Sequence, residues 1–467
     1  MADPLAGDWE GSLEKIYTVG GRRLEGEVIL SGSKNATLAI MSAALLPEEG
    51  QTLLKNVPEI SDVQIMGTLL EHMGVSARFT SNNVLRIDAT NVQSHEAPYE
   101  LIKKMRASFS VLGPILARFG KAKVALPGGC DIGARPVDFH LKGLEQMGAE
   151  IVVEHGFVDA TAPSGLQGAQ ICLEFPSVGA TTHLMAAAAL ARGKTTIVNA
   201  AEEPDVVSCA AFINAMGGKV QGAGTKTIEI EGVDKLTGTA FEMDSDRIEA
   251  GTFAVAALIT GGDLFLRNAI EEHLQPVISK LAEAGAVVER EAAGIRVRYK
   301  ARPKAIRLMA SPHPGFPTDL QPVFASLLAT AKGTSVITET VYERRFKYID
   351  ELNRMGGNLK VEGNAAIIHG VNRLTGAPVA GSDLRATAAL VLAGLAAEGQ
   401  SEVSGVQYLD RGYENLVGKL AQVGADIWRG DQVAAPKRIE EKRVQAGVLR
   451  SAADNDKKTD QTKKQWI

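Results

Sequence analysis

The 467-residue sequence is poor in cysteine and nearly balanced in charge. Three cysteines without paired spacing give no disulfide framework, which is typical of a reducing compartment. The formal net charge of −5 argues against a general nucleic-acid or membrane-surface role. No apolar run reaches the ~18 residues of a membrane span, and the acidic N-terminus is unlike a signal peptide. These absences predict a cytoplasmic protein that binds any anionic ligand through local cations.

The sequence also lacks the spacing of common metal and cofactor sites. Its histidines form no His-Glu-x-x-His pair, and its cysteines have no zinc-ligand spacing. The Gly-rich segment 222–227 contains a lysine but not the spacing of a phosphate-binding loop, and it precedes a strand-like run, so we expect a hairpin turn there. No Gly-x-Gly-x-x-Gly follows the first strand. We therefore expect neither a metal nor an organic cofactor.

What the chain does contain is a sixfold internal repeat. A helix-ending glycine recurs about every 70 residues, at Gly74, Gly148, Gly217, Gly285, Gly356 and Gly424. Each glycine fits the left-handed position that closes a helix. Each unit contains a strand, an Ala/Leu-rich helix, a β-branched strand, a second helix and paired closing strands. The Ala-rich helices are apolar nearly all round, which predicts burial; they cover 36–46, 180–191, 250–260 and 387–397.

This order predicts α/β units with parallel pairing inside each unit. A chain of 467 residues exceeds one ordinary core, so two domains are the default expectation. No terminal unit has the polar outer face of a solenoid cap, which favours two globular domains of three units each. The ends, 1–13 and 431–467, are polar, and we expect flexible or disordered segments there. A short docking segment at 444–449 is the alternative.

The most distinctive chemistry lies in the loop 126–140, between a strand-like run and a helix expected from about Leu141 to Met147. It contains three glycines, two prolines, Cys130 and Arg135. Glycine and proline predict irregular, exposed backbone. Arg135 favours the thiolate of Cys130, whose unperturbed pKa is about 8.5, whereas Asp131 opposes it. The other cysteines, Cys172 in a strand-like run and Cys209 in a helical run, are expected in the core.

Residues 127–138, Pro-Gly-Gly-Cys-Asp-Ile-Gly-Ala-Arg-Pro-Val-Asp, resemble the signature loop of the UDP-N-acetylglucosamine enolpyruvyl transferases, a branch of the EPSP synthase family. The resemblance extends over 14–429. It implies an inside-out α/β barrel with six βαβαββ-type repeats, three in each of two domains around a cleft. It also implies that domain 1 covers 34–243 and carries the Cys130 loop, and that domain 2 covers 14–33 plus 244–430.

The resemblance implies transfer of the enolpyruvyl group of phosphoenolpyruvate to the 3′-hydroxyl of UDP-N-acetylglucosamine, with release of phosphate. This reaction is the first committed step of peptidoglycan biosynthesis. It needs clustered cations for the anions, an acid for the vinyl methylene and a base for the hydroxyl proton. Cys130 is implied as the acid and as the carrier of a covalent pyruvate adduct, and Asp319 as the base. The implied catalytic set is Cys130, Asp319, Lys34, Arg411 and Asp383.

The implied ligand sets follow from the same matching motifs. The phosphoenolpyruvate ligands are Lys34, Asn35, Arg135 and Arg411. The UDP-N-acetylglucosamine ligands are Arg106, Arg135, Pro136, Val137, Asp138, Phe139, Phe175, Pro176, Ser177, Val178, Gly179, Asp319 and Val341. These two small molecules are the expected partners, without nucleic acid or membrane, and the oligomeric state stays open. Cys130 is also the implied target of epoxides such as fosfomycin.

The sequence departs from the family pattern at several positions. Phe175 stands where a lysine is common, Tyr342 replaces a phenylalanine, and Arg344 replaces a polar residue next to Arg345. None of these changes removes a required chemical group. Two rival functions remain open. One is a shikimate-phosphate enolpyruvyl transferase, which a cysteine loop of this form disfavours; the other is a catalytically silent paralogue that binds a UDP-sugar.

Overall fold

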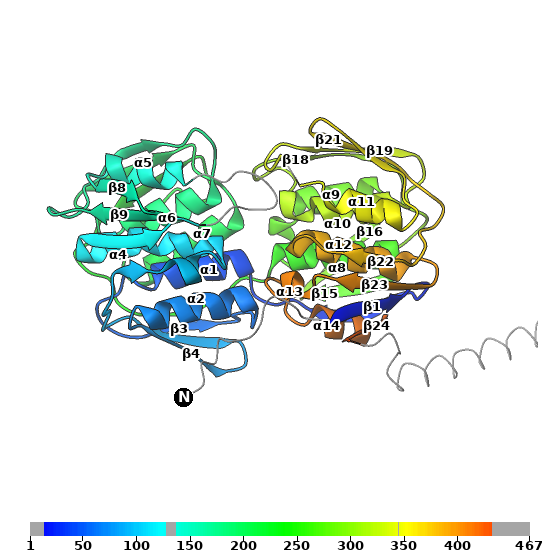
Figure 1. Cartoon of the computed structure of the whole chain (residues 1–467), viewed down its shortest axis with the longest axis horizontal. Helices are drawn as coiled ribbons and strands as arrows, with labels where there is room; N and C mark the ends of the chain where they lie inside the picture. Colours follow the sequence, from blue (N-terminus) through cyan, green and yellow to red (C-terminus); the bar gives the residue numbers. More distant parts are fainter. Residues whose placement is uncertain (1–13, 128–136, 344, 432–467) are drawn as a thin grey trace, which may run out of the picture.

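The computed structural model describes residues 14–127, 137–343 and 345–431. The interpretations of Cys130, Asp131, Arg135, Pro136, Arg344 and of the segments 1–13 and 432–467 lie outside the described residues. Two lobes lie side by side along the long axis of the molecule (Figure 1). Each has its own hydrophobic core, one formed by residues within 38–243 and the other by residues within 16–30 and 248–427.

Each lobe contains three four-stranded sheets with the same pairing pattern, one parallel pair followed by two antiparallel pairs. In spatial order, the sheets of the first lobe are β14 (Ala240–Glu242), β3 (Thr52–Lys55), β5 (Val84–Asp88), β4 (Ser76–Ser81); β6 (Glu96–Ala97), β7 (Lys121–Ala125), β9 (Phe157–Thr161), β8 (Glu150–Glu154); and β10 (Gln170–Cys172), β11 (Lys194–Val198), β13 (Thr227–Glu231), β12 (Lys219–Gln221). Those of the second lobe are β2 (Glu25–Ile29), β15 (Asp263–Arg267), β17 (Gly294–Arg298), β16 (Val287–Glu291); β18 (Arg307–Ala310), β19 (Thr334–Glu339), β21 (Ala365–His369), β20 (Leu359–Glu362); and β22 (Pro378–Ala380), β23 (Gln400–Ser404), β1 (Lys15–Val19), β24 (Asp426–Gly430).

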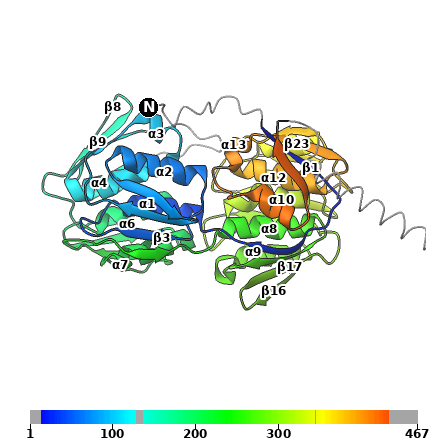
Figure 2. The same cartoon turned by 90° about the horizontal axis from the view of Figure 1, so that it is seen from below.

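The first two strands of the chain pair with strands that come more than 200 residues later in the sequence. β1 lies antiparallel between β23 and β24, with Ile16 opposite Val403 and Arg429. β2 runs parallel to β15, and both strands are part of the second lobe, where Figure 2 shows β1 and β23. β14 pairs in turn with β3 and so completes a sheet of the first lobe. The chain therefore crosses between the lobes twice, after β2 and after β14.

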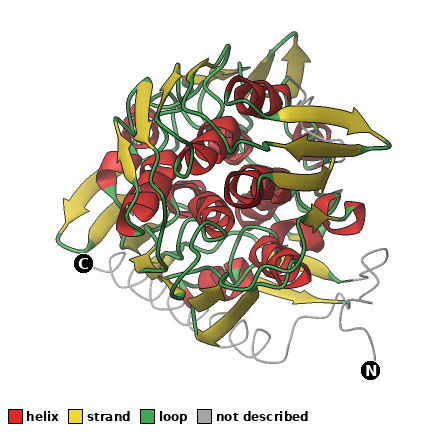
Figure 3. Cartoon of the chain, turned by 90° about the vertical axis from the view of Figure 1, so that its left-hand side faces the viewer, coloured by secondary structure: helices red, strands yellow, loops and turns green. Residues whose placement is uncertain are grey.

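Helices fill the inside of each lobe and the sheets cover the outside, as Figure 3 shows. The Ala-rich helices α1 (Lys34–Ala43), α6 (Val178–Ala188), α8 (Arg247–Ile259) and α12 (Leu384–Ala396) are buried along nearly their whole length, which confirms the prediction from their apolar character. The other helices are α2 (Ser61–His72), α3 (Tyr99–Ile102), η1 (Arg106–Val111), α4 (Leu112–Phe119), α5 (Asp138–Gln146), α7 (Pro204–Ala215), η2 (Glu271–His273), α9 (Gln275–Glu283), η3 (Thr318–Leu320), α10 (Gln321–Leu328), α11 (Tyr348–Arg354), α13 (Val406–Leu409) and α14 (Leu416–Gln422).

The repeat glycines have the backbone conformation that the sequence predicts. Their φ angles are 88° at Gly74, 87° at Gly148, 101° at Gly217, 101° at Gly285, 84° at Gly356 and 102° at Gly424. Residues that carry a side chain rarely adopt this left-handed backbone conformation, so glycine closes each of these helices at little steric cost. One glycine per unit thus turns the chain from the second helix toward the closing strands.

Two local predictions were wrong and two were right, one of which is the burial of Cys209. Cys172 is exposed rather than in the core, because the short strand β10 alternates and points Ile171 inward. The helix expected from about Leu141 begins earlier, at Asp138. The hairpin turn predicted at 222–227 does connect β12 and β13, and Thr227 is the first residue of β13. Within the described residues, none of the helices has the length and apolar character needed to cross a membrane.

Candidate active site

A cavity of about 610 Å³ lies between the two lobes, lined by residues of both. Four of the buried helices begin at this cavity, because the first residues of α1, α6, α8 and α12 are among those that line it. The N-termini of these helices are capped by side chains that accept hydrogen bonds from backbone N–H groups, namely Ser33, Ser177, Asp246 and Asp383. Helix N-termini carry partial positive charge, so their convergence favours an anionic ligand.

The cavity brings together most of the predicted site residues. Those that line it are Lys34, Asn35, Arg106, Val137, Phe139, Phe175, Pro176, Ser177, Val178, Gly179, Asp319, Val341, Asp383 and Arg411. Among the predicted residues that the structure describes, Asp138 does not line the cavity; its carboxylate lies 3.9 Å from Lys142 Nζ on the same helix. Cys130, Arg135 and Pro136 lie outside the described residues.

Lys34 and Arg411 share one buried carboxylate, although they belong to different lobes. Lys34 Nζ lies 2.8 Å from Asp62 Oδ2, and Arg411 Nε lies 2.9 Å from Asp62 Oδ1. Burial tends to raise the pKa of Asp62, but Lys34 and Arg411 more than offset it and hold that pKa below its usual range. Burial lowers the pKa of Lys34, and Asp62 opposes that effect. Asp62 thus keeps two cations of opposite lobes close together at the cavity.

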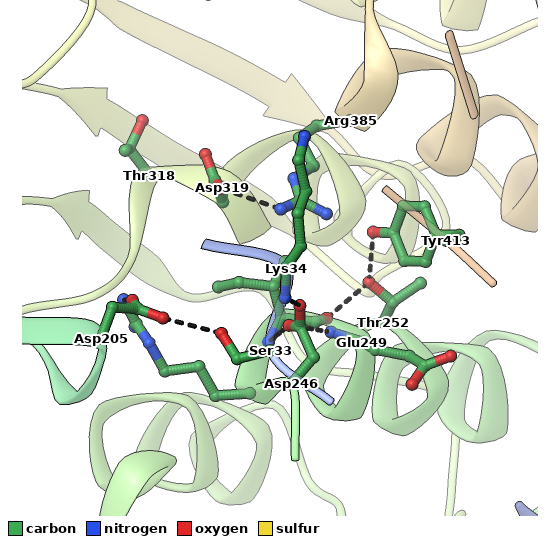
Figure 4. A network of polar contacts seen from close by, with 12 residues as sticks. Ser33, Lys34, Asp205, Asp246, Glu249, Thr252, Thr318, Asp319, Arg385 and Tyr413 are labelled. Carbon is green, nitrogen blue, oxygen red and sulfur yellow. Dashed lines mark hydrogen bonds and ion pairs between the residues drawn. The ribbon is translucent and has the colours of Figure 1, made fainter. Parts of the chain in front are cut away.

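Asp319 is held by two arginines of its own lobe. Arg345 Nη2 lies 2.7 Å from Asp319 Oδ1. Arg385 Nη2 lies 3.0 Å from Asp319 Oδ2, the contact drawn in Figure 4. Burial alone would raise the pKa of Asp319, but the two guanidinium groups hold the pKa well below its usual range. Arg385 lies over the ring of Tyr413, 5.3 Å from the ring centre, which fixes the arginine from behind. Asp319 is therefore a carboxylate at neutral pH, and its orientation is fixed.

A third group of polar side chains surrounds the start of α1, where the chain enters the first lobe. Lys34 N donates to Asp246 Oδ2 over 3.1 Å, and Asp246 Oδ1 caps α8 through the N–H groups of Ile248 and Glu249. Ser33 Oγ donates to Asp205 over 2.8 Å (Figure 4). One carboxylate, Asp246, therefore ties the N-termini of two helices from different lobes together beneath the cavity.

Asp383 differs from Asp319, although both were predicted as catalytic residues. Its Oδ1 accepts the N–H groups of Arg385 at 2.9 Å and Ala386 at 3.0 Å, so it is the cap of α12. The capping bonds account for its position at the start of α12, and its predicted catalytic role stays a prediction.

The described lining residues carry six cationic side chains, Lys34, Arg106, Arg247, Arg345, Arg385 and Arg411. They carry four carboxylates, Glu203, Asp205, Asp319 and Asp383. The cavity is therefore cationic in a chain whose overall net charge is −5. Charge-assisted hydrogen bonds to a bound anion contribute about 1.5–3 kcal/mol each, so a few of these side chains suffice to hold a small polyanion.

Sequence reasoning missed several residues of this site. Asp62 was not predicted, and it carries no local motif, since its partner Arg411 is 349 positions away. Arg345 and Arg385 are absent from the predicted catalytic and ligand sets, yet they hold Asp319. For Arg385 a signal existed, because it lies two residues after a capping aspartate at a helix N-terminus.

The chain belongs to the EPSP synthase family, because the sequence model of that family, EPSP synthase (3-phosphoshikimate 1-carboxyvinyltransferase), matches residues 19–420. Within that family it is similar to a UDP-N-acetylglucosamine 1-carboxyvinyltransferase 1 of Halalkalibacterium halodurans, with 51% identity over 417 residues, 89% of this chain and 94% of the relative. It is 50% identical to the UDP-N-acetylglucosamine 1-carboxyvinyltransferase of Trichlorobacter lovleyi, over 89% of this chain and 99% of the relative.

Solved structures match the fold. The enolpyruvyl transferase NikO of Streptomyces tendae superposes with a TM-score of 0.80 at 25% identity, over 89% of this chain and 98% of that one. An EPSP synthase of Acinetobacter baumannii gives a TM-score of 0.71 at 22% identity, over 89% of this chain and 100% of that one. The inside-out α/β fold with six repeats that the sequence implied is thereby confirmed.

Proposed function

We propose that the chain transfers the enolpyruvyl group of phosphoenolpyruvate to the 3′-hydroxyl of UDP-N-acetylglucosamine and releases phosphate. The observation that carries this proposal is the cationic cavity, where Lys34 and Arg411 from different lobes share Asp62. A substrate with a carboxylate and a phosphate needs several fixed cations in one place. The names of the similar proteins from two bacteria support the choice of acceptor and a role in peptidoglycan synthesis.

Phosphoenolpyruvate is proposed to bind beside Lys34, Asn35 and Arg411, with Arg135 as a further ligand. Burial lowers the pKa of Lys34, so an anion next to its amine favours the charged form and gains a charge-assisted contact. The nucleotide sugar is proposed to lie along the wall formed by Val137, Phe139 and 175–179. In this proposed arrangement the two substrates occupy neighbouring parts of the cavity.

The proposed chemistry assigns one proton transfer to each of two side chains. Cys130 gives its thiol proton to the vinyl methylene of phosphoenolpyruvate while the 3′-oxygen bonds to the adjacent carbon. Asp319, already a carboxylate at neutral pH, accepts the proton of the hydroxyl. Loss of phosphate together with a methyl proton then restores the vinyl group on the sugar. Cys130 is also the proposed carrier of the pyruvate adduct and the target of fosfomycin.

The proposed domain boundaries follow the two hydrophobic cores. Domain 1 covers 34–243, and domain 2 covers 14–33 plus 244–430. On this division the cavity residues Lys34 and Arg411 come from different domains. We also propose that the protein acts in the cytoplasm, because its nucleotide-sugar and phosphoenolpyruvate substrates are cytoplasmic metabolites.

The test is phosphate release from phosphoenolpyruvate with and without UDP-N-acetylglucosamine, and with shikimate 3-phosphate as the alternative acceptor. We expect phosphate release from phosphoenolpyruvate when UDP-N-acetylglucosamine is the acceptor. We expect none without an acceptor or with shikimate 3-phosphate. Cys130→Ala is the control and is expected to abolish release while nucleotide-sugar binding is retained. Release with shikimate 3-phosphate, or equal release from the Cys130→Ala variant, contradicts the proposal. Binding of the nucleotide sugar without any release by the wild type would favour the silent paralogue.

A further inference from the structure

Two histidines to which the sequence analysis assigns no role contact each other at the cavity wall. His140 lies in α5 and His183 in α6, and their Nδ1 atoms are 3.0 Å apart. His183 is buried, whereas His140 is partly exposed and lines the cavity. Phe109 packs edge-on against the ring of His140, with ring centres 5.6 Å apart. The pair therefore connects the interior of the first lobe to the cavity.

The proton positions in this pair follow from one backbone amide. Gly113 N–H donates to His183 Nε2 over 2.6 Å, so this nitrogen is an acceptor without a proton. The neutral His183 ring then carries its proton on Nδ1, which donates to Nδ1 of His140. Nδ1 of His140 is consequently an acceptor, and the proton of the neutral His140 ring is on Nε2. Burial lowers the pKa of both rings, to about 3 for His183, which keeps them neutral.

Glycine at position 113 is needed for this contact. A Cβ atom there would lie 2.7 Å from Nε2 of His183, closer than real Cβ atoms approach such a neighbour. The absence of a side chain thus lets the imidazole reach the backbone amide and fixes the direction of the whole chain of hydrogen bonds.

The free end of this chain points to the cavity. Nε2 of His140 lies 3.6 Å from the position of a Cβ on Gly179, which also lines the cavity. Among the described residues we find no acceptor for this N–H, and the atom is not one of those buried without a partner. Its surroundings are electropositive, because Arg106 is close enough to lower the pKa of His140 and α6 begins here with its cap Ser177.

We propose that His140 binds substrate by donating its Nε2–H to a phosphate oxygen of the nucleotide sugar, and that Gly113 and His183 fix the proton on that nitrogen. The inference rests on the proposed function for the identity of the ligand. A neutral donor beside Arg106 and a helix N-terminus suits an anionic oxygen that needs several N–H groups at once. His183 is a positioning residue, since it acts through His140.

Two substitutions of His140 separate this role from a structural one. In His140→Asn the side-chain oxygen replaces Nδ1, so the contact to His183 is kept and the donor to the cavity is lost. In His140→Gln the amide nitrogen replaces Nε2, so the donor is kept and the contact to His183 is lost. A purely structural role predicts that the Asn variant binds better than the Gln variant, whereas our proposal predicts the reverse.

The experiment measures Kd for UDP-N-acetylglucosamine and for UDP by calorimetry, with KM and kcat from phosphate release and melting curves as a folding check. We expect His140→Asn to weaken binding of both ligands by about 10-fold or more, as for a lost hydrogen bond to a charged group, with the loss in KM rather than kcat. His140→Gln should stay within about 3-fold of the wild type. Nitrogen-15 spectra of the wild type should show the proton of His140 on Nε2.

Several results would overturn the inference: unchanged binding by a folded His140→Asn variant, a loss with UDP-N-acetylglucosamine but not with UDP, or a proton on Nδ1 of His140. If the wild type binds the nucleotide sugar but releases no phosphate, the proposed function fails and the Asn–Gln contrast in Kd still decides the role of His140. If the wild type binds neither UDP-N-acetylglucosamine nor UDP, both proposals fail.

Discussion

Two carboxylates at the cavity, Asp62 and Asp319, are each held by two cations, but they differ in which lobes supply them. The partners of Asp62 come from both lobes, whereas the partners of Asp319 both come from the second lobe. The side chain of Asp62 is 2% exposed and that of Asp319 is 24% exposed. Asp319 is therefore open to a substrate and independent of how the lobes sit, while Asp62 is sealed and depends on their contact. Two similar clusters of charged residues thus differ: one leaves Asp319 open to the cavity for its proposed role in the reaction, and the other joins the lobes through Asp62.

The largest expected effect is on turnover, from Asp319→Asn. The substitution keeps the shape of the side chain and removes the proposed proton acceptor, so kcat should fall by about 100-fold or more. The measurement is steady-state phosphate release. The control is Asp263→Asn, which removes a carboxylate that pairs with Arg296 away from the cavity, at 2.9 Å. A kcat within a factor of three of the wild type for Asp319→Asn would break the comparison.

Asp62→Asn should instead act mainly on stability. It leaves Lys34 and Arg411 near one another without their shared anion, and loss of one partner of a buried ion pair costs about 3 kcal/mol or more. Inorganic phosphate should raise the melting temperature of this variant more than that of the wild type, because the anion replaces the lost carboxylate. The readouts are denaturant unfolding and melting curves with and without phosphate. An unchanged melting temperature, or equal stabilisation of both proteins by phosphate, would show that Asp62 does not hold the two cations.

Lowering the pH separates the two carboxylates from the histidine pair, because their contributions to stability change in different pH ranges. The folded-state pKa values of Asp62 and Asp319 are lowered, so their contribution is present above the unfolded value of 3.8 and is lost below it. His183 has a folded-state pKa of about 3 against 6.5, so the unfolded state binds more protons between these values. Stability should therefore fall as the pH drops below about 6.5, by up to about 1.4 kcal/mol per unit.

The variant for this acid effect is His183→Gln, whose amide oxygen can still accept from Gly113. Urea unfolding at pH 7 and pH 4.5 should show a smaller acid loss in the variant than in the wild type. Equal losses in the two proteins would place the acid sensitivity elsewhere in the chain.

The smallest expected effect concerns a more exposed contact between the lobes. Glu414 accepts hydrogen bonds from Glu59 N at 2.9 Å and from Asn83 Nδ2 at 2.7 Å, both in the first lobe. Because these contacts are partly exposed, Glu414→Gln should favour separated lobes by less than about 1 kcal/mol. Small-angle scattering of the ligand-free variant should show a slightly larger radius of gyration. A radius larger than that of Asp62→Asn would reverse the order of importance of the two contacts.

The periodic features of the fold could be predicted from the sequence, and the reason is local. The repeat glycines have the predicted positive φ angles because a helix end needs only its own few residues to form. The burial of α8 and α12 follows from composition alone. The burial of Cys172 was predicted wrongly, because a three-residue strand gives too little alternation to show which face points inward.

The candidate site was predictable to the extent that motifs marked it. Lys34, Arg106 and Arg411 line the cavity as expected. Asp62 and the pair of His140 and His183 could not be predicted, because their roles depend on partners brought together only by tertiary structure. Distant pairs of this kind leave no pattern in a single sequence, since neither member alone differs from an ordinary polar residue.

The position of β1 and β2 has a consequence for how this protein is made. Both strands leave the ribosome first, yet β2 pairs with β15 and β1 pairs with β23 and β24, which are synthesised much later. The first lobe can complete its sheets once β14 has emerged, while the two earliest strands still wait without partners. Unpaired strand edges are prone to aggregation, so the nascent second lobe is the part of the chain that most needs protection during translation.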